Sequence, residues 1–384
     1  MVKRARGPGG RGSGAVVILA ALVWIIPGAA FPQKSPEFSI NLQFNYAAAE
    51  ECIRLYGDEF VSTRALSELR GNLIAASTAG LIANRRDVPS LLKSYLDSLR
   101  NHQQITGDVY HLEDARRGLA TIRELLAEIK KRNLSQRIAA TVGQLFPREA
   151  VVSCTIPVYV VAFGHENADA YVRRILWKDD VPSFTGGESG ELTIVINLAA
   201  SVRYGSNTEE RLLSLLTVMA HEVFHAAFGV YKETSPFWKR YYLKYSSPFD
   251  ALLDITQNEG IAYYLSLDQE WRGNLPPEWP ARTKNAVAAF NSNASELLSP
   301  RIARERASEL LRRANLSGYW ESFGSMTGML IAREIDLRLG RPALIETVER
   351  GPADFFSKYI RLTEEDSNLP KLKKLLESEI GARL

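Results

Sequence analysis

The feature that most constrains this chain is the run His221-Glu222-Val223-Phe224-His225. Residues four apart on an α-helix lie on one face, with their β-carbons about 5–6 Å apart. This separation allows both imidazoles to reach a single metal ion, each at a distance of roughly 2.0–2.1 Å. The run therefore predicts a helix that presents two metal ligands, with a carboxylate beside the first of them.

The residues before this run favour a helix. Residues 209–220 carry apolar side chains at helical spacing. Asn207 and Thr208 are suitable N-terminal caps, and Gly229 is predicted to end the helix one turn after the second histidine. The alternative is a buried helix with two hydrogen-bonded core histidines, but this alternative leaves Glu222 on an apolar helix without a role.

A catalytic zinc ion usually has three protein ligands, so one more ligand is required. No histidine follows His225, and an acidic residue must therefore supply it. The best candidate is Glu259, in an apolar segment that is predicted to be helical from about residue 249 to residue 267. Its neighbours Gly260 and Ala262 are small, and we expect them to let this helix approach the helix that carries the histidines.

Other acidic residues are weaker candidates for the third ligand. Asp254 is the alternative, five residues earlier and therefore on a different face of the same predicted helix. Glu233 and Glu270 are interpreted as solvated charges in a loop or at a helix end. The preferred set predicts a Zn²⁺ site with the ligands His221, His225 and Glu259.

These residue types predict hydrolysis of an amide-like bond. A zinc ion held in this way activates a water molecule and polarises a substrate carbonyl. Glu222 then acts as the general base and passes the proton to the leaving amine. The tetrahedral intermediate needs a second electrophile, and Tyr263, one turn after Glu259, is the first candidate for it. Tyr319 and His165 are the alternatives.

The first thirty residues have the pattern of a secretory signal peptide. Four basic residues precede an unbroken apolar run of 12 residues, Ala15 to Ile26, and Gly28-Ala29-Ala30 is a small-residue cleavage site. We expect cleavage after Ala30 and a secreted or periplasmic protein without a stable membrane span, because so short an apolar run does not easily cross a bilayer. An uncleaved anchor is the alternative.

The net charge argues against one class of partner. The chain has 47 basic and 44 acidic residues and a formal net charge of +3. Segment 1–30 holds four basic and no acidic residues, so its removal leaves a net charge of −1. The basic balance therefore belongs to the targeting segment and does not indicate nucleic-acid binding. The expected partner is a peptide or protein substrate, and the oligomeric state is not predicted.

Two further sequence features concern an exported protein. Cys52 and Cys154 are the two cysteines of the chain, and the sequence leaves open whether they form a disulfide. Three segments match the glycosylation sequon, which matters only in a eukaryotic secretory pathway. These sequons begin at Asn133, Asn293 and Asn315.

The hydrophobic pattern changes from helical to strand-like near residue 151. Residues 31–42 are predicted to be an irregular linker, and successive amphipathic helices follow it. The predicted helices cover roughly residues 45–56, 61–83, 87–103, 112–132 and 135–145. Residues 151–163 and 191–198 are rich in β-branched side chains and are predicted to be strands, with Pro157 indicating an edge or a bend. After residue 235 the pattern is helical again.

The expected fold is α+β and mostly α-helical, with a small β-sheet packed on the helix that carries the two histidines. The expected organisation is a signal peptide at residues 1–30, an N-terminal helical region at 31–148 and a catalytic region at 149–384. The two mature regions are compatible with one compact unit.

The motifs also resemble a known family. The HExxH run followed some thirty residues later by Asn258-Glu259-Gly260-Ile261-Ala262 resembles the Glu-type zincins, or gluzincins. The chain is most similar to secreted zinc-dependent peptidases that form a domain family of unknown function. The resemblance continues in residues 325–335, 339–341 and 351–359. It implies a zincin-like core, ligands at His221, His225 and Glu259, and a catalytic role for Glu222, but it does not indicate the substrate.

Two other functions compete with that of a peptidase. The first is a non-catalytic zinc-binding or peptide-binding protein on a zincin scaffold. Glu222 argues against it, because a metal site used only for binding has no need of a general base. The second is a helical interaction protein with a fortuitous motif, which metal analysis of the purified protein would distinguish from the others.

Overall fold

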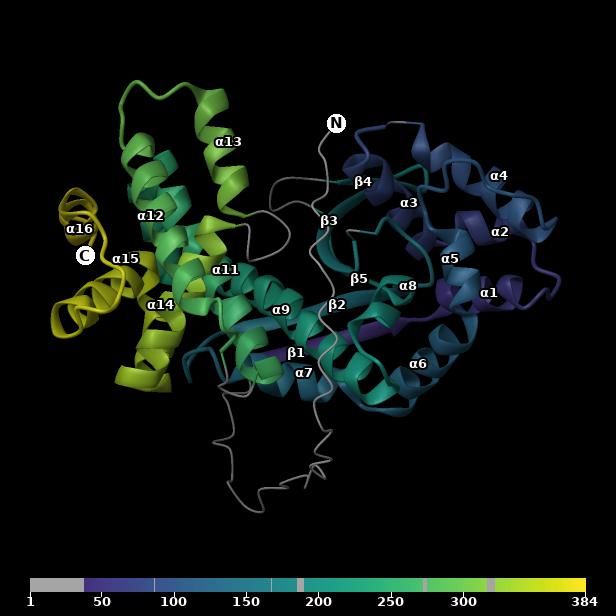
Figure 1. The fold of residues 1–384 in the computed structure, drawn as a ribbon, viewed down its shortest axis with the longest axis horizontal. Helices are drawn as coiled ribbons and strands as arrows, with labels where there is room; N and C mark the ends of the chain where they lie inside the picture. The colour runs from purple at the N-terminus through teal and green to yellow at the C-terminus, as the bar shows by residue number, and fades with distance from the viewer. Residues whose placement is uncertain (1–37, 86, 167, 185–189, 272–274, 316–321) are drawn as a thin grey trace, which may run out of the picture. The chain divides into compact units, whose positions relative to one another are not determined.

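The computed structural model describes residues 38–384, except for residues 86, 167, 185–189, 272–274 and 316–321. The described residues belong to one compact unit, Ser35–Leu384. The predicted signal peptide and its cleavage site lie outside the described residues. The fold of the unit is α+β and mostly helical, as the sequence predicts, with a small sheet between groups of helices (Figure 1).

The sheet has five strands in the order β1-β2-β5-β3-β4. The first three are parallel to one another, β3 is antiparallel to β5, and β4 is antiparallel to β3. The two predicted strands are confirmed as β2 and β5, and the sequence analysis missed the other three. The strands are β1 (Phe38–Asn45), β2 (Val152–Val161), β3 (Ala170–Lys178), β4 (Val181–Phe184) and β5 (Glu191–Asn197).

Strand β1 corrects the prediction of an irregular linker at residues 31–42. From Phe38 onward the chain is extended, with Ile40 and Leu42 buried and their neighbours more exposed. This alternation is typical of a half-buried strand. The strand pairs in register with β2, which lies more than a hundred residues later in the sequence, so local pattern alone gave only a weak signal.

Pro157 lies inside β2, at a position that agrees with its lack of a backbone N–H. It is in register with Gln43 of β1, whereas the pairing between β2 and β5 begins only at Val158. At this residue β2 has a strand partner on one side only. The prediction of an edge or a bend is therefore met locally, within a strand that becomes central one residue later.

Between β1 and β2 the chain forms a series of helices. Two of the predicted stretches are broken into pairs, because Leu69 adopts an extended backbone between α2 and α3 and Gly118 separates α5 from α6. Helix α3 packs closely on the sheet, since a β-carbon at Gly71 would lie only 3.2–3.3 Å from side-chain atoms of Val161 and Tyr159. The helices are α1 (Ala47–Tyr56), α2 (Thr63–Glu68), α3 (Arg70–Ile82), α4 (Val88–Arg100), α5 (Leu112–Arg117), α6 (Leu119–Lys131) and α7 (Leu134–Gly143).

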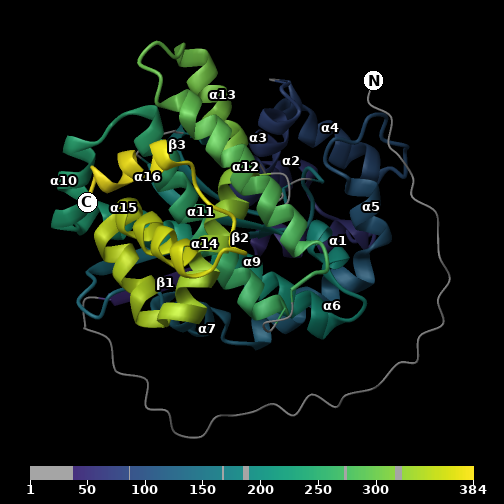
Figure 2. The ribbon, with the colours of Figure 1, turned by 60° about the vertical axis from the view of Figure 1, so that its left-hand side comes forward.

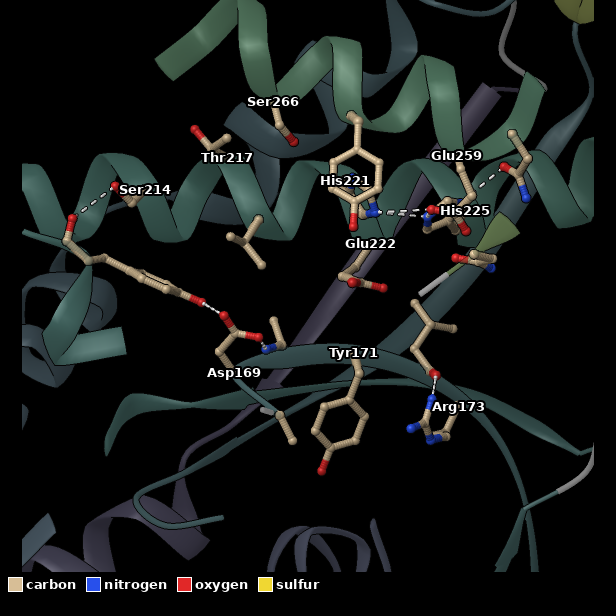
Figure 3. Close-up of a pocket in the computed structure, with 18 of the residues that line it drawn as sticks. Asp169, Tyr171, Arg173, Ser214, Thr217, His221, Glu222, His225, Glu259 and Ser266 are labelled. Atoms are coloured by element: carbon tan, nitrogen blue, oxygen red, sulfur yellow. Dashed lines mark hydrogen bonds and ion pairs between the residues drawn. The ribbon is translucent and has the colours of Figure 1, made fainter. Parts of the chain in front are cut away.

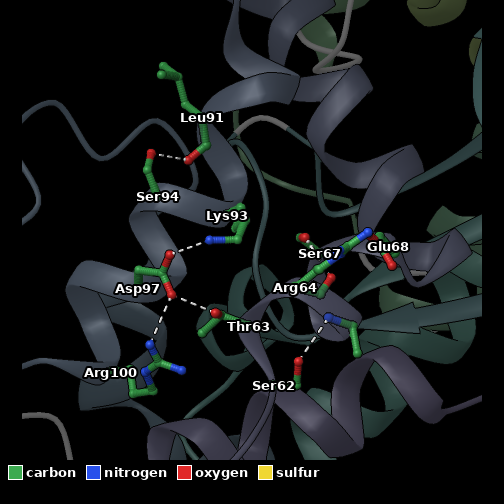
Figure 4. Close-up of polar contacts among 11 residues, drawn as sticks. Ser62, Thr63, Arg64, Ser67, Glu68, Leu91, Lys93, Ser94, Asp97 and Arg100 are labelled. Atoms are coloured by element: carbon green, nitrogen blue, oxygen red, sulfur yellow. Dashed lines mark hydrogen bonds and ion pairs between the residues drawn. The ribbon is translucent and has the colours of Figure 1, made fainter.

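A polar cluster joins α2 to α4 (Figure 4). The hydroxyl of Thr63 donates a hydrogen bond to Asp97 at 2.5 Å. The same carboxylate pairs with Lys93 at 2.7 Å and with Arg100 at 3.2 Å, both on its own helix. These exposed ion pairs lie within α4 and contribute little to stability, and the hydroxyl contact is the one in this cluster that links the two helices.

Helix α9 (Thr208–Thr234) carries the HExxH run near its middle. Asn207 caps it as predicted, because its side chain accepts a hydrogen bond from the backbone N–H of Glu210 at 3.0 Å. The prediction that Gly229 ends the helix is wrong, and the helix continues to Thr234. A glycine stops a helix by adopting a left-handed conformation, and Gly229 does not adopt one.

The apolar length of α9 serves the protein core. Among the described helices it alone is long and apolar enough to cross a membrane, yet 61% of its most apolar window is buried inside the fold. Phe224 and Phe228 on one side of the helix contact the ring of Phe146, which precedes β2. These contacts explain why α9 is so apolar: it is a helix of the protein core.

The remaining helices lie mainly after α9. Figures 1 and 2 show α11 between α9 and a group formed by α12, α14 and α15, in agreement with the contacts between these helices. The short elements before α9 are α8 (Leu198–Ser201) and η1 (Val202–Tyr204). The later helices are α10 (Pro236–Lys244), α11 (Pro248–Trp271), α12 (Trp279–Leu297), α13 (Arg304–Ala314), α14 (Phe323–Leu339), α15 (Arg341–Glu365) and α16 (Lys374–Gly381).

The two cysteines are free thiols in this structure. Cys52 is buried in α1, and burial raises the pKa of its thiol to about 12. Cys154 lies on β2, where burial raises its pKa to about 11. The disulfide that the sequence left open is therefore not formed, and neither thiol is activated as a nucleophile.

Candidate active site

Four of the predicted site residues meet between two helices. His221, Glu222 and His225 project from α9 and Glu259 from α11 (Figure 3). The Nε2 atoms of the two imidazoles are 2.9 Å apart. Oε2 of Glu259 lies 3.8 Å from Nε2 of His221 and 3.5 Å from Nε2 of His225. Three ligand atoms of a tetrahedral zinc site are about 3.3 Å apart, so these side chains have the spacing and donor types that the ion requires.

The electrostatics of this cluster also favour a cation. Burial lowers the pKa of His221, and the charge of His225 lowers it further, to about 3. Burial also acts to lower the pKa of His225, but the charge and hydrogen bond of Glu259 outweigh it and raise that pKa to about 9. Burial opposes ionisation of Glu259, yet the charge and hydrogen bond of His225 hold its pKa below the usual value. The buried carboxylate is thus stabilised by one positive charge between the three side chains.

The imidazoles are oriented by hydrogen bonds on the side away from the cluster. Nδ1 of His225 lies 3.0 Å from Oδ1 of Asn258, the residue before Glu259. A hydrogen bond from His221 to the backbone of Ala262 does the same for the first ring. Such bonds fix the tautomer that leaves Nε2 as the metal ligand and hold the ring in place. Helix α11 therefore supplies one proposed ligand and orients the other two.

The carboxylate of Glu259 has an orienting partner of its own. The side chain of Asn315, which follows α13, forms a hydrogen bond with this carboxylate and lowers its pKa. In the sequence, Asn315 is recognisable only as the start of a glycosylation sequon. Sequence gave no signal for its place in the site, because the helix that positions it is separate from both ligand helices.

A close helix crossing positions Glu259, but it differs from the predicted one. Gly260 faces α14, where an added β-carbon would overlap the backbone of Gly328. In the same way, a β-carbon at Gly328 would overlap the carbonyl oxygen of Thr256 on α11. The prediction that Gly260 lets α11 approach the histidine helix is therefore wrong. This glycine instead allows α14 to press against the back of α11, while Ala262 is buried.

The other acidic candidates are engaged elsewhere or lie outside the described side chains. Asp254 forms an ion pair with Lys232 and accepts a hydrogen bond from the hydroxyl of Tyr242 at 2.8 Å. Glu233 pairs with Arg174 at 2.8 Å. The side chain of Glu270 lies outside the described part of the chain. Of the candidates whose side chains the structure describes, only Glu259 is grouped with the two histidines.

The cluster lies at the wall of a cleft with a volume of about 720 Å³. Residues of α9, α11 and β3 line this cleft, Glu222 among them. Burial raises the pKa of Glu222 to about 7, with the charge of His225 acting against this shift and that of Glu259 adding to it. A carboxylate with a pKa near neutrality is well suited to accept and then return a proton.

Of the three predicted candidates for the second electrophile, Tyr263 lies in the cleft. Its ring packs against the ring of His221, with centroids 4.3 Å apart and an interplanar angle of 62°. His165 is not among the residues that line the cleft and instead contacts the ring of His111. Tyr319 lies outside the described residues. The catalytic role of Tyr263 remains a prediction.

The structure adds polar cleft residues that were not predicted from the sequence, among them Asp169, Arg173 and Tyr204. The hydroxyl of Tyr204 donates a hydrogen bond to Asp169 at 2.6 Å, and burial raises the pKa of this tyrosine. Arg173 lies on β3 and Asp169 immediately before it. They were missed because β3 itself was not predicted, although Tyr171, Val172 and Ile175 have strand-forming side chains.

The fold and the site together define an α+β protein with two histidines of an HExxH helix and a glutamate from a second helix as a candidate metal centre. Residues 41–368 match the family described as "Putative zinc dependent peptidase (DUF5700)", and the chain belongs to this family. The searches of curated proteins and of solved structures gave no match.

Proposed function

We propose that this protein is an exported zinc-dependent peptidase that hydrolyses peptide bonds. One observation carries the proposal. The ligand atoms of His221, His225 and Glu259 converge, and Glu222 stands beside them in the same cleft. A protein that only stored or bound zinc would not need a buried carboxylate with a pKa near 7 at this place.

The reaction divides between the ion and the side chains of the chain. A bound zinc ion supplies Lewis acidity, which makes water more acidic and polarises the substrate carbonyl. Glu222 takes a proton from the attacking water at its carboxylate and later delivers it to the leaving amine nitrogen. Tyr263 is proposed to donate its hydroxyl hydrogen to the oxygen that becomes negative in the tetrahedral intermediate.

The edge of β3 offers a place for an extended substrate. Strand β4 pairs with β3 only from Ile175 to Lys178, so the preceding residues have β5 as their only strand partner among the described strands. The backbone N–H of Asn197 donates to the carbonyl of Asp169, and hydrogen bonds alternate along an antiparallel pair. The carbonyl of Ala170 and the N–H of Val172 therefore face away from β5, where a peptide backbone can pair with them. The N–H of Ala170 and the carbonyl of Val172 already have side-chain partners.

Cleavage of a peptide library tests the proposal. The zinc-loaded protein is incubated with the library, with and without a chelator, and the products are identified by mass spectrometry. Glu222→Gln should retain zinc and lose hydrolysis, because it removes the base and keeps the ligands. Glu233→Gln is a matched control on the same helix, since Glu233 pairs with Arg174. Equal hydrolysis by wild type and Glu222→Gln would overturn the mechanism.

Export is a separate part of the proposal. The basic segment, the apolar run from Ala15 to Ile26 and the small residues up to Ala30 support it. N-terminal sequencing of the protein recovered from the medium or periplasm should give Phe31 as the first residue. Recovery of the uncleaved chain in the membrane fraction would favour the anchor instead.

A further inference from the structure

Arg173 is a cation of the cleft wall that no carboxylate of the described residues pairs with. Its Nε–H is buried and has no hydrogen-bond partner among these residues. The next residue, Arg174, differs in this respect because it forms an ion pair with Glu233 at 2.8 Å. A buried guanidinium N–H without an acceptor is unfavourable in the free protein, and an incoming anion relieves that penalty.

The guanidinium is held in place before any ligand arrives. Nη1 donates a hydrogen bond to the carbonyl oxygen of Val172 at 3.0 Å. Cζ lies 4.9 Å from the ring centre of Tyr171 and 5.7 Å from that of Phe184. Figure 3 shows Arg173 beside β3 with this bond to the strand. Because the side chain is already ordered by one hydrogen bond and two rings, little conformational entropy is lost when it binds a carboxylate.

Two carboxylates of the cleft, Asp169 and Glu259, have other partners. Asp169 accepts hydrogen bonds from the hydroxyl of Tyr204 at 2.6 Å and from the backbone N–H of Ala170 at 3.1 Å. Glu259 is turned toward the histidines. Arg173 and Glu222 line the same cleft without forming an ion pair, and the charge of Arg173 lowers the pKa of Glu222.

The position of Arg173 also limits the open edge of β3. The guanidinium donates a hydrogen bond to the carbonyl of Val172, so this carbonyl is not free to pair with a peptide. From Ile175 onward, β4 pairs with this edge of β3. A peptide that pairs with the carbonyl of Ala170 and the N–H of Val172 therefore meets a positive charge at the point where the free edge ends. This arrangement suits a substrate that carries a negative group there.

We propose that Arg173 binds a carboxylate of the substrate and makes carboxylate-bearing peptides the preferred substrates of the site. The inference rests on the proposed peptidase function and deepens it. The carboxylate is either the C-terminus of a short peptide or the side chain of an Asp or Glu close to the scissile bond. Both sources offer two oxygens to the planar N–H groups of arginine.

The first experiment measures binding without hydrolysis, with zinc-loaded Glu222→Gln as the background. One pair of peptides has the same sequence and ends in a free carboxylate or in an amide. A second pair is blocked at both ends and has Glu or Gln beside the cleaved bond. We expect the carboxylate member of one pair to bind roughly tenfold tighter or more. The first pair identifies the terminal carboxylate as the source, and the second identifies the side chain.

The second experiment introduces Arg173→Gln, Arg173→Lys and, as a matched control, Arg174→Gln. The ratio of the affinities for the carboxylate and the neutral peptide should fall to about one in Arg173→Gln. It should persist in part in Arg173→Lys and remain unchanged in Arg174→Gln. In the hydrolytically active protein, the same loss should appear in kcat/KM for carboxylate peptides and not for amides. Thermal unfolding and zinc content of each variant verify its fold, and Arg173→Lys serves if the glutamine variant does not fold.

The outcomes separate this inference from the peptidase proposal. Equal binding of both members of both pairs, or a preference that survives in Arg173→Gln, overturns the role of Arg173. An Arg173-dependent preference in binding without hydrolysis by the wild-type protein sustains the carboxylate site and overturns the peptidase function.

Discussion

The ligands of the candidate metal centre come from two regions that are built differently. His221 and His225 are one helical turn apart on α9, and their Nε2 atoms meet at 2.9 Å because the helix itself sets their spacing. Glu259 reaches the same point from α11, which is held from behind by its contact with α14 at Gly260 and Gly328. The first pair depends on local geometry, whereas the third ligand depends on long-range packing. In a metal site assembled in this way, only one of the three ligands depends on the tertiary fold for its position.

The largest effect is expected where packing places the third ligand. In Gly328→Ala the new β-carbon would overlap the carbonyl of Thr256, so α11 and α14 must separate and carry Glu259 away from the histidines. We expect the free energy of unfolding to fall by about 3 kcal/mol or more and zinc binding to weaken with it. Chemical denaturation and zinc titration by calorimetry measure the two effects. An unchanged zinc affinity would show that the crossing does not position the ligand.

Removal of the third ligand itself should affect the metal without disturbing the fold. Glu259→Gln keeps the size of the side chain and removes its charge, and we expect zinc affinity to fall by more than about 100-fold. The control Glu233→Gln should bind zinc as the wild type does. Competition with a chelator of known affinity measures both. If Glu259→Gln bound zinc normally, Glu259 would not be a ligand.

A smaller effect is expected from the residues that orient the ligands. Asn258→Ala removes the partner of the second imidazole, and Asn315→Ala removes the partner of the glutamate. Each should reduce zinc affinity about 10–100-fold and leave the chain folded, because such partners orient a ligand without replacing it. The same chelator competition applies. If only one variant lost zinc affinity, only the ligand that contacts the changed residue would need a hydrogen-bond partner to hold it in place.

The smallest effect concerns a glycine with no packing role. Gly229 lies within α9, and a β-carbon there would meet no atom within 4 Å. Gly229→Ala should stabilise the protein by about 0.5–1 kcal/mol, since alanine loses less backbone entropy in a helix. It is also the matched control for Gly328→Ala. A destabilising effect, seen in the same denaturation experiment, would contradict the absence of a packing role for Gly229.

Much of the site could be predicted because its parts are local. The HExxH spacing, the Asn207 cap and the strands at 152–161 and 191–197 all have signals within a few residues of one another. Strands β1, β3 and β4 could not be predicted with the same ease, because polar or charged side chains interrupt their apolar residues and they lack the β-branched runs of β2 and β5. Arg173 and Asp169 were not predicted as site residues because β3 was not predicted, and Asn315 was interpreted only as part of a glycosylation sequon.

The sequence by itself determined the residue types of the candidate site and the fold class: two imidazoles and a carboxylate on one helix, acidic residues on a second helix, and a mostly helical α+β composition. The sequence favoured Glu259 as the third ligand, and only the tertiary structure placed it beside the histidines. Only the structure also showed that Gly260 faces α14 and that no carboxylate of the described residues pairs with Arg173. The physical reason is the distance along the sequence over which each of these interactions acts. Helical periodicity places side chains relative to their own backbone, but the approach of two helices depends on which residues on both are small enough to let them touch.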